Sequence, residues 1–168
     1  MKNYFYSFLL ALPVLLLSAT AVNASAPDVS LVGLDNKQHN LNEYIGRGKW
    51  VVLNVWGTKC PPCVEEMPEL QAFHDKRSAK DAIVVAMAID FPSYGYASQG
   101  EVKQFADDYF IDFPILLGDA SVVPQFGAGG LRGTPTSYVY TPRGKLVAVQ
   151  LGAVTEKIIS DFIDSYKE

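Results

Sequence analysis

The sequence has few of the residues that mark several classes of protein. It contains two cysteines and two histidines among 168 residues, too few for a disulfide-rich scaffold or a zinc ribbon. Positive charge is sparse as well, because Lys and Arg number 14, form no cluster, and leave a net charge of −4. We therefore expect no nucleic-acid partner. Disorder is excluded because 49% of the residues are hydrophobic, and the length suits one globular domain.

The N-terminal segment has the pattern of an export signal. Lys2 precedes an uncharged stretch over residues 3–27, in which Val22-Asn23-Ala24 has the small-x-small form that signal peptidase cleaves. We predict a signal peptide over 1–24, a folded domain over 25–168 and a periplasmic location. The alternative is an uncleaved membrane anchor, which a proline and polar residues within the stretch disfavour. Either interpretation places the domain where disulfides can persist.

The hydrophobic patterns that follow predict alternating strands and helices. Strands are expected at 29–32, 38–41, 50–56, 82–89, 136–140 and 146–151, the first two and last two as hairpins, and residues 113–117 form a short apolar segment. Helices are expected after Pro61-Pro62, over 102–110, over 121–126 and over 158–166, with Pro68 kinking the first of them. Residues 90–100 are expected to form an exposed loop. This order predicts an α/β fold with a mixed sheet and helices on both of its faces.

The two cysteines lie in the segment Cys60-Pro61-Pro62-Cys63, between a predicted buried strand and a predicted helix. Two thiols at this spacing can close a disulfide. The N-terminus of a helix carries unpaired N–H groups and a partial positive charge, both of which stabilise a thiolate. We therefore expect Cys60 to have a depressed pKa and to be the attacking sulfur, and Cys63 to be shielded and to resolve the mixed disulfide.

Three other uses of the cysteines are less favoured. A structural disulfide over so short a loop would stabilise the fold only weakly. A metal site would need more ligands, and the two histidines, His39 and His74, stand in no recognisable ligand pair. A catalytic cysteine paired with histidine is disfavoured because the second thiol would invite oxidation. We expect neither a metal nor a cofactor.

Two separated motifs carry a resemblance to a known family. They are the run from Val52 to Cys63 with Glu65 to Pro68 after it, and Gly133-Thr134-Pro135-Thr136 far downstream. The first resembles the active-site segment of the TlpA/ResA-type branch of the thioredoxin-like family, and the second is similar to its cis-proline loop. The resemblance covers about residues 27–167. It implies a thioredoxin-like fold, with a central mixed β-sheet flanked by helices and an N-terminal β-hairpin extension.

The resemblance also implies an activity and partners. Members of this branch are thiol-disulfide oxidoreductases that usually reduce disulfides of other proteins outside the cytoplasm, cytochrome c maturation being one setting. It implies a cis peptide bond before Pro135 and pairing of the Thr134 backbone with the substrate. We accordingly assign Thr134, Pro135 and Trp56 to substrate binding. Expected partners are disulfide-containing exported proteins and a membrane thiol-disulfide electron donor.

The sequence departs from this family directly before the first cysteine. Lys59 stands where the family usually has an aromatic residue. An apolar platform for partners is lost, and a cation is placed beside the nucleophile. We expect Lys59 to lower the pKa of Cys60 further, although solvent and salt would screen an exposed ammonium group.

A second departure concerns the group that accepts a proton from Cys63. Asn54 occupies the strand position where ordinary thioredoxins have a buried aspartate, and an amide cannot take that role. Asp90, at the end of the second buried strand, is our candidate, with a solvent-facing turn aspartate as the equal alternative. Glu65 and Glu66 are interpreted as acids near the helix N-terminus that complement its dipole.

The resulting hypothesis is a periplasmic enzyme that reduces disulfides in partner proteins. The Cys60 thiolate attacks the partner disulfide, and Cys63 then displaces the product and leaves a Cys60–Cys63 disulfide. Two other hypotheses stay open. One is a thiol oxidase or isomerase, and the other is a non-enzymatic metal-binding chaperone that uses the same cysteines as ligands.

Overall fold

A computed structural model describes residues 26–89 and 98–167. The predicted signal peptide over 1–24 and the candidate acid–base residue Asp90 lie outside the described residues. Among the helices of the described ranges, none combines the length and the apolar character that crossing a membrane would require.

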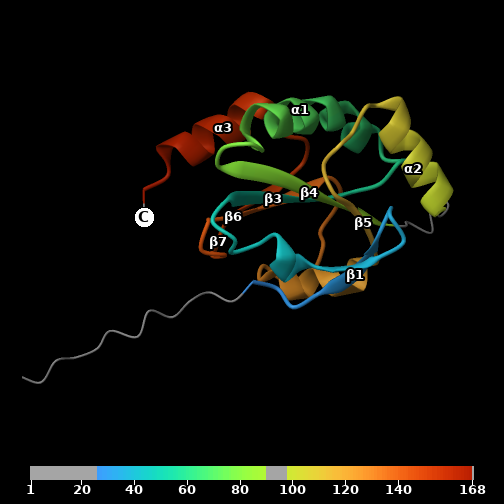
Figure 1. Cartoon of the computed structure of the whole chain (residues 1–168), viewed down its shortest axis with the longest axis horizontal. Helices are drawn as coiled ribbons and strands as arrows, with labels where there is room; N and C mark the ends of the chain where they lie inside the picture. Colours follow the sequence, from blue (N-terminus) through green and yellow to red (C-terminus); the bar gives the residue numbers. More distant parts are fainter. Residues whose placement is uncertain (1–25, 90–97, 168) are drawn as a thin grey trace, which may run out of the picture.

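Seven strands form one sheet in the order β2-β1-β5-β4-β3-β6-β7 (Figure 1). The strands are β1 (Ser30–Gly33), β2 (Gln38–Asn40), β3 (Trp50–Trp56), β4 (Ala82–Ile89), β5 (Ile115–Gly118), β6 (Thr136–Tyr140) and β7 (Leu146–Leu151). The helices are α1 (Pro61–Arg77), α2 (Gln99–Asp108) and α3 (Glu156–Ser165), with the 3-10 helices η1 (Leu41–Glu43) and η3 (Ala120–Phe126). The predicted mixed sheet and N-terminal hairpin are confirmed.

Strand β3 lies at the centre of the sheet and sets the position of the cysteines. It pairs in parallel with β4, from Trp50 opposite Ala82 to Trp56 opposite Ala88. It pairs antiparallel with β6, with Val55 opposite Thr136. The end of β3 therefore lies beside the start of β6, and the segments that follow the one and precede the other meet at the same edge of the sheet.

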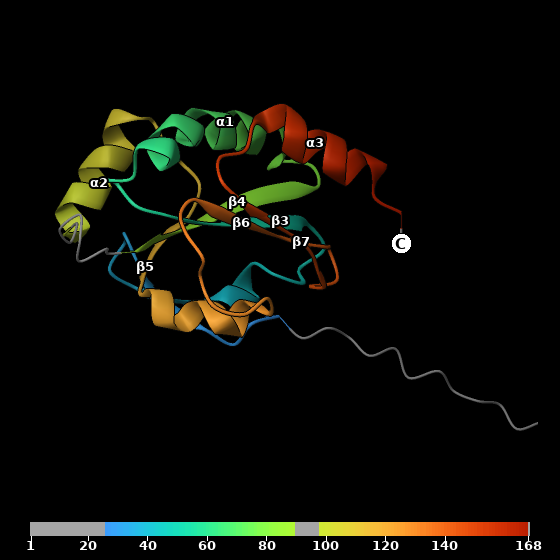
Figure 2. The same ribbon diagram turned by 180° about the vertical axis from the view of Figure 1, so that it is seen from behind.

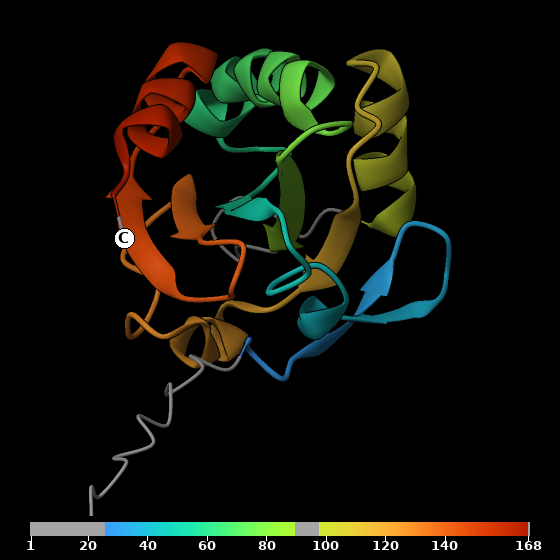
Figure 3. The same ribbon diagram turned by 60° about the vertical axis from the view of Figure 1, so that its left-hand side comes forward.

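The two faces of the sheet are covered differently. Helices α1, α2 and α3 lie side by side over one face, where their apolar side chains share a core with alternate residues of β3 and β4 (Figure 2). The opposite face is covered by η1 and η3 (Figure 3). Helices therefore lie on both faces as predicted, but those of the second face are short 3-10 segments.

Two local expectations need correction. Helix α1 continues through Pro68 to Arg77, so the proline does not interrupt it. Pro68 is exposed, and the carbonyl group that a proline leaves unpaired is tolerated on the solvent side of a helix. Helix α2 ends at Asp108, whereas the apolar spacing predicted a helix as far as Phe110. Phe110 instead has a φ of 54° and a side chain that is 85% exposed.

Candidate active site

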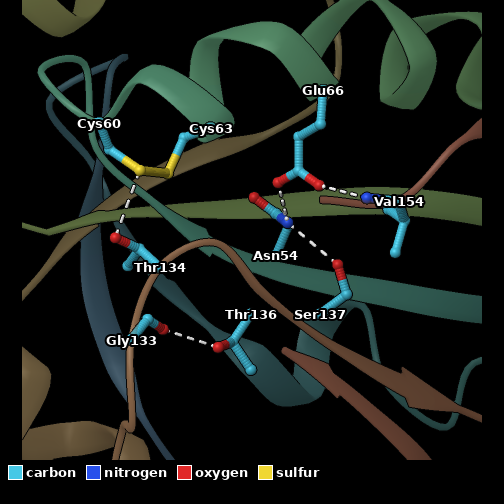
Figure 4. The surroundings of a disulfide bond; sticks show 9 residues. All are labelled: Asn54, Cys60, Cys63, Glu66, Gly133, Thr134, Thr136, Ser137 and Val154. Atoms are coloured by element: carbon cyan, nitrogen blue, oxygen red, sulfur yellow. Dashed lines mark hydrogen bonds between the residues drawn. A yellow bond between two sulfur atoms is a disulfide. The ribbon is translucent and has the colours of Figure 1, made fainter. Parts of the chain in front are cut away.

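The cysteines lie where β3 gives way to α1. Cys60 is the N-cap residue of α1, and its carbonyl group accepts hydrogen bonds from the N–H groups of Cys63 (2.9 Å) and Val64 (3.1 Å). Both prolines of the motif lie in the first turn, where a backbone N–H group would have no acceptor within the helix, so its absence costs no hydrogen bond. Cys60 and Cys63 form a disulfide, and their Cα atoms are 5.2 Å apart (Figure 4).

The two sulfurs differ in their access to solvent. Cys60 is 7% exposed, whereas Cys63 is fully buried. Cys63 faces the core that α1 shares with the sheet, among residues such as Met67. Cys60 is thus the more accessible of the two cysteines, and the division between attacking and resolving thiol stays a prediction.

The loop before β6 faces the disulfide, as the pairing of β3 with β6 requires. The peptide bond between Thr134 and Pro135 is cis, as the resemblance implies. The Thr134 hydroxyl donates a hydrogen bond to Cys60 Sγ at 3.4 Å. The loop is held by bonds from the Thr136 hydroxyl to the Gly133 carbonyl (2.7 Å) and from the Gly152 N–H to the Pro135 carbonyl (2.9 Å). The Thr134 side chain thus offers a hydroxyl donor to the exposed sulfur.

A buried carboxyl group lies one turn along α1 from Cys63, and sequence reasoning misplaced it. Glu66 is 2% exposed, whereas it was interpreted as an acid complementing the helix dipole. The first turn of α1 contains no acidic residue, so that interpretation is wrong for Glu66. The side chain points into the core, toward strand β3 (Figure 4). Residues three apart on a helix share one face, so Glu66 and Cys63 lie on the same side of α1.

Two hydrogen bonds hold this carboxyl group in place, and a third holds the amide that donates one of them. Asn54 Nδ2 donates to Glu66 Oε1 at 2.8 Å and to Ser137 Oγ at 3.0 Å, and the Val154 N–H donates to Glu66 Oε2 at 2.9 Å. Burial raises the pKa of Glu66 to about 7, although the bonds from Val154 and Asn54 partly offset the shift. A carboxyl group that titrates near neutral pH can exchange a proton with a neighbouring thiol.

Lys59 forms an ion pair with an acidic residue of α2. Its ammonium nitrogen lies 3.5 Å from Glu101 Oε1 in the first turn of α2. Glu101 also closes a capping box with Ser98, and these hydrogen bonds and the Lys59 charge lower the pKa of the carboxyl group. Both side chains are about half exposed. The pair therefore contributes little free energy and partly neutralises the cation that was expected to act on Cys60.

The substrate-binding assignment of Trp56 is not supported by its position. The side chain is fully buried, and its ring packs against Phe105 of α2 with a centroid distance of 4.9 Å. Trp56 belongs to the core that also contains both cysteines. Because Trp56 belongs to a strand that is buried on both faces, its side chain packs beneath the segment that carries the cysteines and cannot contact a partner directly.

The histidines lie apart from the cysteines and are engaged elsewhere. His39 contacts Asp35 and Glu43 in the N-terminal segment, and His74 Nδ1 accepts a hydrogen bond from the Val84 N–H. Within residues 26–89 and 98–167, no group of three or more His, Cys, Asp or Glu side chains is arranged to hold a metal ion.

Comparison with known proteins agrees with this geometry. A family profile described as AhpC/TSA matches residues 22–149, more than half of the chain. The chain belongs to the AhpC/TSA family. It is 31% identical to the thiol-disulfide oxidoreductase ResA of Geobacillus thermodenitrificans over 151 residues, which cover 89% of this chain and 80% of that protein. It is 32% identical over 139 residues to the thioredoxin-like protein YneN of Bacillus subtilis, covering 83% and 76%.

Two solved structures share the fold. A DsbF homologue from Corynebacterium diphtheriae superposes with a TM-score of 0.72 at 27% identity, covering 84% of this chain and 85% of that one. A secreted thiol-disulfide isomerase from Corynebacterium glutamicum gives 0.72 at 25% identity, covering 81% of each. The resemblance to the ResA-type branch, the thioredoxin-like fold and the enzyme class, thiol-disulfide oxidoreductase, are therefore confirmed.

Proposed function

We propose that this enzyme acts outside the cytoplasm, in the periplasm, as a reductant of disulfides in exported proteins. The observation that carries the proposal is the unequal exposure of the two cysteine residues, 7% for Cys60 and none for Cys63. In the dithiol form, the Cys60 thiolate attacks one sulfur of the partner disulfide and expels the other as a thiolate. Cys63 then attacks Cys60 Sγ, releases the second partner thiol and closes the Cys60–Cys63 disulfide.

Each step of this cycle has a group placed to assist it. The helix N-terminus and the Thr134 hydroxyl stabilise negative charge on Cys60. Glu66 accepts the proton of Cys63 as that thiol becomes the nucleophile. This role replaces the one that Asp90 was expected to fill, because Glu66 lies on the same face of α1 as Cys63 and is buried with it.

The charges around the cysteines favour the reductant direction. A site that strongly stabilises the reduced thiolate makes the disulfide form a strong oxidant. Here the Lys59 ammonium group is paired with Glu101, and the buried ionisable group on the inner side of the site is the Glu66 carboxyl group, which carries no positive charge. The dithiol therefore gains little from positive side chains, which supports reduction over oxidation. A membrane thiol-disulfide carrier is the proposed donor that restores the dithiol.

The substrates we propose are oxidised cysteine pairs in extended segments of exported proteins. The cis-proline loop lies beside the exposed sulfur, and the Thr134 backbone is proposed to pair with such a segment. The haem-attachment pairs of c-type cytochrome precursors, Cys-x-x-Cys-His, belong to this class. Reduction of those pairs would place the enzyme in cytochrome c maturation.

Trapping of covalent adducts tests the mechanism. In Cys63→Ser the exposed Cys60 can still attack, but nothing resolves the adduct, so mixed disulfides with exported proteins should accumulate and dissolve with dithiothreitol. Cys60→Ser is the matched control and should trap little, because its remaining thiol is buried. Trapping by both variants alike, or by neither, would contradict the assignment. Mass spectrometry of the adducts identifies the substrates.

A glutathione redox titration tests the direction of electron flow. A reductant should have a potential below that of the surrounding thiol pool, and a tenfold change in the equilibrium constant corresponds to about 30 mV for this two-electron couple. A potential well above the pool would support the oxidase or isomerase hypothesis instead. Copper bound at the cysteines with no turnover of insulin would favour the chaperone hypothesis.

A further inference from the structure

The C-terminus of α2 holds an aromatic residue in a backbone conformation that favours glycine. The Ile111 N–H donates to the Ala106 carbonyl at 2.9 Å, and the Phe110 N–H donates to the Asp107 carbonyl at 3.3 Å. This pair of bonds is the Schellman motif, in which the residue after the cap adopts the left-handed conformation. Phe110 occupies that position with a φ of 54°. A residue with a Cβ atom is strained there, whereas glycine is not.

The Phe110 side chain does not compensate for this strain by packing. It is 85% exposed, more than any other large hydrophobic residue of the described ranges. Tyr109 beside it is 41% exposed, and its ring stacks on Phe105 at a centroid distance of 4.2 Å. Stacking on Phe105 thus holds the Tyr109 ring at the surface, and the largely exposed Phe110 is the next residue. Glycine at position 110 would therefore make the isolated chain more stable than phenylalanine does.

Carboxylates that form no ion pair within the described ranges flank these aromatic residues in the sequence, as Asp108 and Asp112 do, or share a hydrogen-bond donor with one that does, as Asp75 does. Gln71 Nε2 donates to Asp75 Oδ1 and to Asp112 Oδ1, each at 2.7 Å, so one amide nitrogen holds the two carboxylates side by side. Asp108 accepts from the amide of Gln104. Asp75, Asp108 and Asp112 form no ion pair within the part of the chain that the structure describes. By contrast, Asp107 on the same helix pairs with Lys103 at 3.0 Å.

The surroundings add negative rather than positive charge. The C-terminal end of a helix carries the negative end of its dipole. His74 lies within electrostatic reach of Asp75 and Asp112, but burial lowers its pKa, and its Nδ1 accepts a hydrogen bond from Val84. It is therefore neutral and does not balance the carboxylates. Exposed aromatic rings together with carboxylates that form no ion pair suit a cationic partner, because arginine and lysine bind both aromatic ring faces and carboxylates.

We propose that the end of α2 is a docking surface for a basic segment of a partner protein. The surface consists of Tyr109, Phe110, Asp75, Asp108 and Asp112, with an arginine or lysine of the partner lying over the Phe110 ring. A second copy of this chain would bring the same acidic surface against itself, and an anionic membrane would be repelled. The surface lies at the opposite end of α2 from Glu101, the residue that Lys59 approaches, and the ten-residue helix spans about 15 Å. A partner can therefore bind there and leave Cys60 accessible.

Binding of a defined peptide tests the surface. The probe is a fluorescent 12-residue peptide of alternating arginine and leucine, and its counterpart with glutamate for arginine is the control. We expect the basic peptide to bind with an affinity that falls as salt rises, and Phe110→Gly to weaken it at least tenfold. Asp112→Asn keeps an oxygen for the Gln71 bond and removes the charge, so it should weaken binding about threefold. Ile158→Ala, a control at another exposed apolar residue, should change nothing.

A second measurement addresses the strain at position 110. Phe110→Gly should raise the Tm by about 1–3 °C, because it relieves the left-handed backbone and loses little packing. Reduction of insulin should stay at the wild-type rate, since Phe110 does not belong to the active site. A Tm that falls by several degrees would show that the ring stabilises the isolated fold, and the inference would fail. Equal peptide affinity in wild type and Phe110→Gly, or Phe110-dependent binding to anionic vesicles instead of the peptide, would also overturn it.

Discussion

The active site has an outer half that meets solvent and an inner half that is sealed from it, and the two are built differently. The outer half comprises Cys60, Thr134 and Lys59. One long hydrogen bond links Thr134 to Cys60, and Lys59 forms an exposed ion pair with Glu101. The inner half comprises Cys63 and Glu66. Its carboxyl group is fixed by two hydrogen bonds, one from the sheet and one from the segment before α3. Contacts in the outer half are few and adjustable, as suits a surface that binds varied partners. The inner half is rigid and dry, as suits proton transfer.

The difference predicts how substitutions will act. In the inner half, a charge is costly because burial removes it from water, so each polar group has a large effect on stability and on pH dependence. In the outer half, solvent screens charges, so single substitutions change rates by small factors. The following substitutions test that contrast, beginning with the one of largest expected effect.

Glu66→Gln should have the largest effect on stability, and the effect should depend on pH. The folded-state pKa of Glu66 is raised from 4.5 to about 7. Its contribution to stability is therefore fully present below pH 4.5 and is lost as the pH rises through about 7. The full change corresponds to about 3 kcal/mol of unfolding free energy. Urea denaturation at pH 4.5 and 8 should show this loss in the wild type and a much smaller loss in Glu66→Gln. Equal losses in the two proteins would contradict the buried position of the charge.

Thr134→Val should have a smaller effect, confined to the exposed sulfur. The substitution keeps the shape of the side chain and removes the hydroxyl that donates to Cys60 Sγ. A hydrogen bond to a charged acceptor is worth about 1.5–3 kcal/mol when well formed, and this one is long and only partly buried. Alkylation of Cys60 in the reduced protein at pH 6 should therefore slow about fivefold, while the Tm changes little. An unchanged rate of alkylation would mean that the helix N-terminus alone stabilises the thiolate.

Lys59→Ala should have the smallest effect. The ammonium group is about half exposed and is shared with Glu101. Alkylation of Cys60 should slow by less than about threefold at low salt, and the difference should vanish at 0.5 M salt. Glu101→Gln is the matched variant, because it frees the Lys59 charge and should speed alkylation slightly. A change after Lys59→Ala as large as that after Thr134→Val would place Lys59 among the main determinants of reactivity.

Much of the fold follows from the sequence because its signals are local. Strands β3, β4, β6 and β7 have the predicted bounds, since runs of β-branched and aromatic residues between turn residues leave little ambiguity. The end of α2 was misjudged, because Tyr109 and Phe110 continue the apolar spacing and no glycine marks the left-handed position. Spacing alone cannot reveal a Schellman motif built on phenylalanine.

The sequence predicted those parts of the active site that belong to a recognisable motif. It did not predict the part that depends on contacts between segments distant in the sequence. The cysteine pair and the cis-proline loop are recognisable motifs. Glu66 is not, although two signals point to it: it lies at helical spacing between Cys63 and Leu70 on the buried face, and Asn54 interrupts an apolar strand and so needs a polar partner. The opposite error concerns Trp56, whose substrate-binding assignment overlooked that β3 is buried on both sides.

The resolution step measures the inner half most directly. When reduced enzyme reacts with one equivalent of dithiobis(nitrobenzoate), Cys60 attacks one sulfur, forms a mixed disulfide and expels the first thionitrobenzoate. Attack by Cys63 then expels the second thionitrobenzoate, and this second phase of the absorbance is followed by stopped flow. We expect the rate of this release to rise with an inflection near pH 7 in the wild type, as Glu66 becomes able to accept the Cys63 proton. In Glu66→Gln the release should be about tenfold slower at pH 7 and lack that inflection. The same rate and the same pH profile in both proteins would contradict the central claim that the buried carboxyl group handles the proton of Cys63.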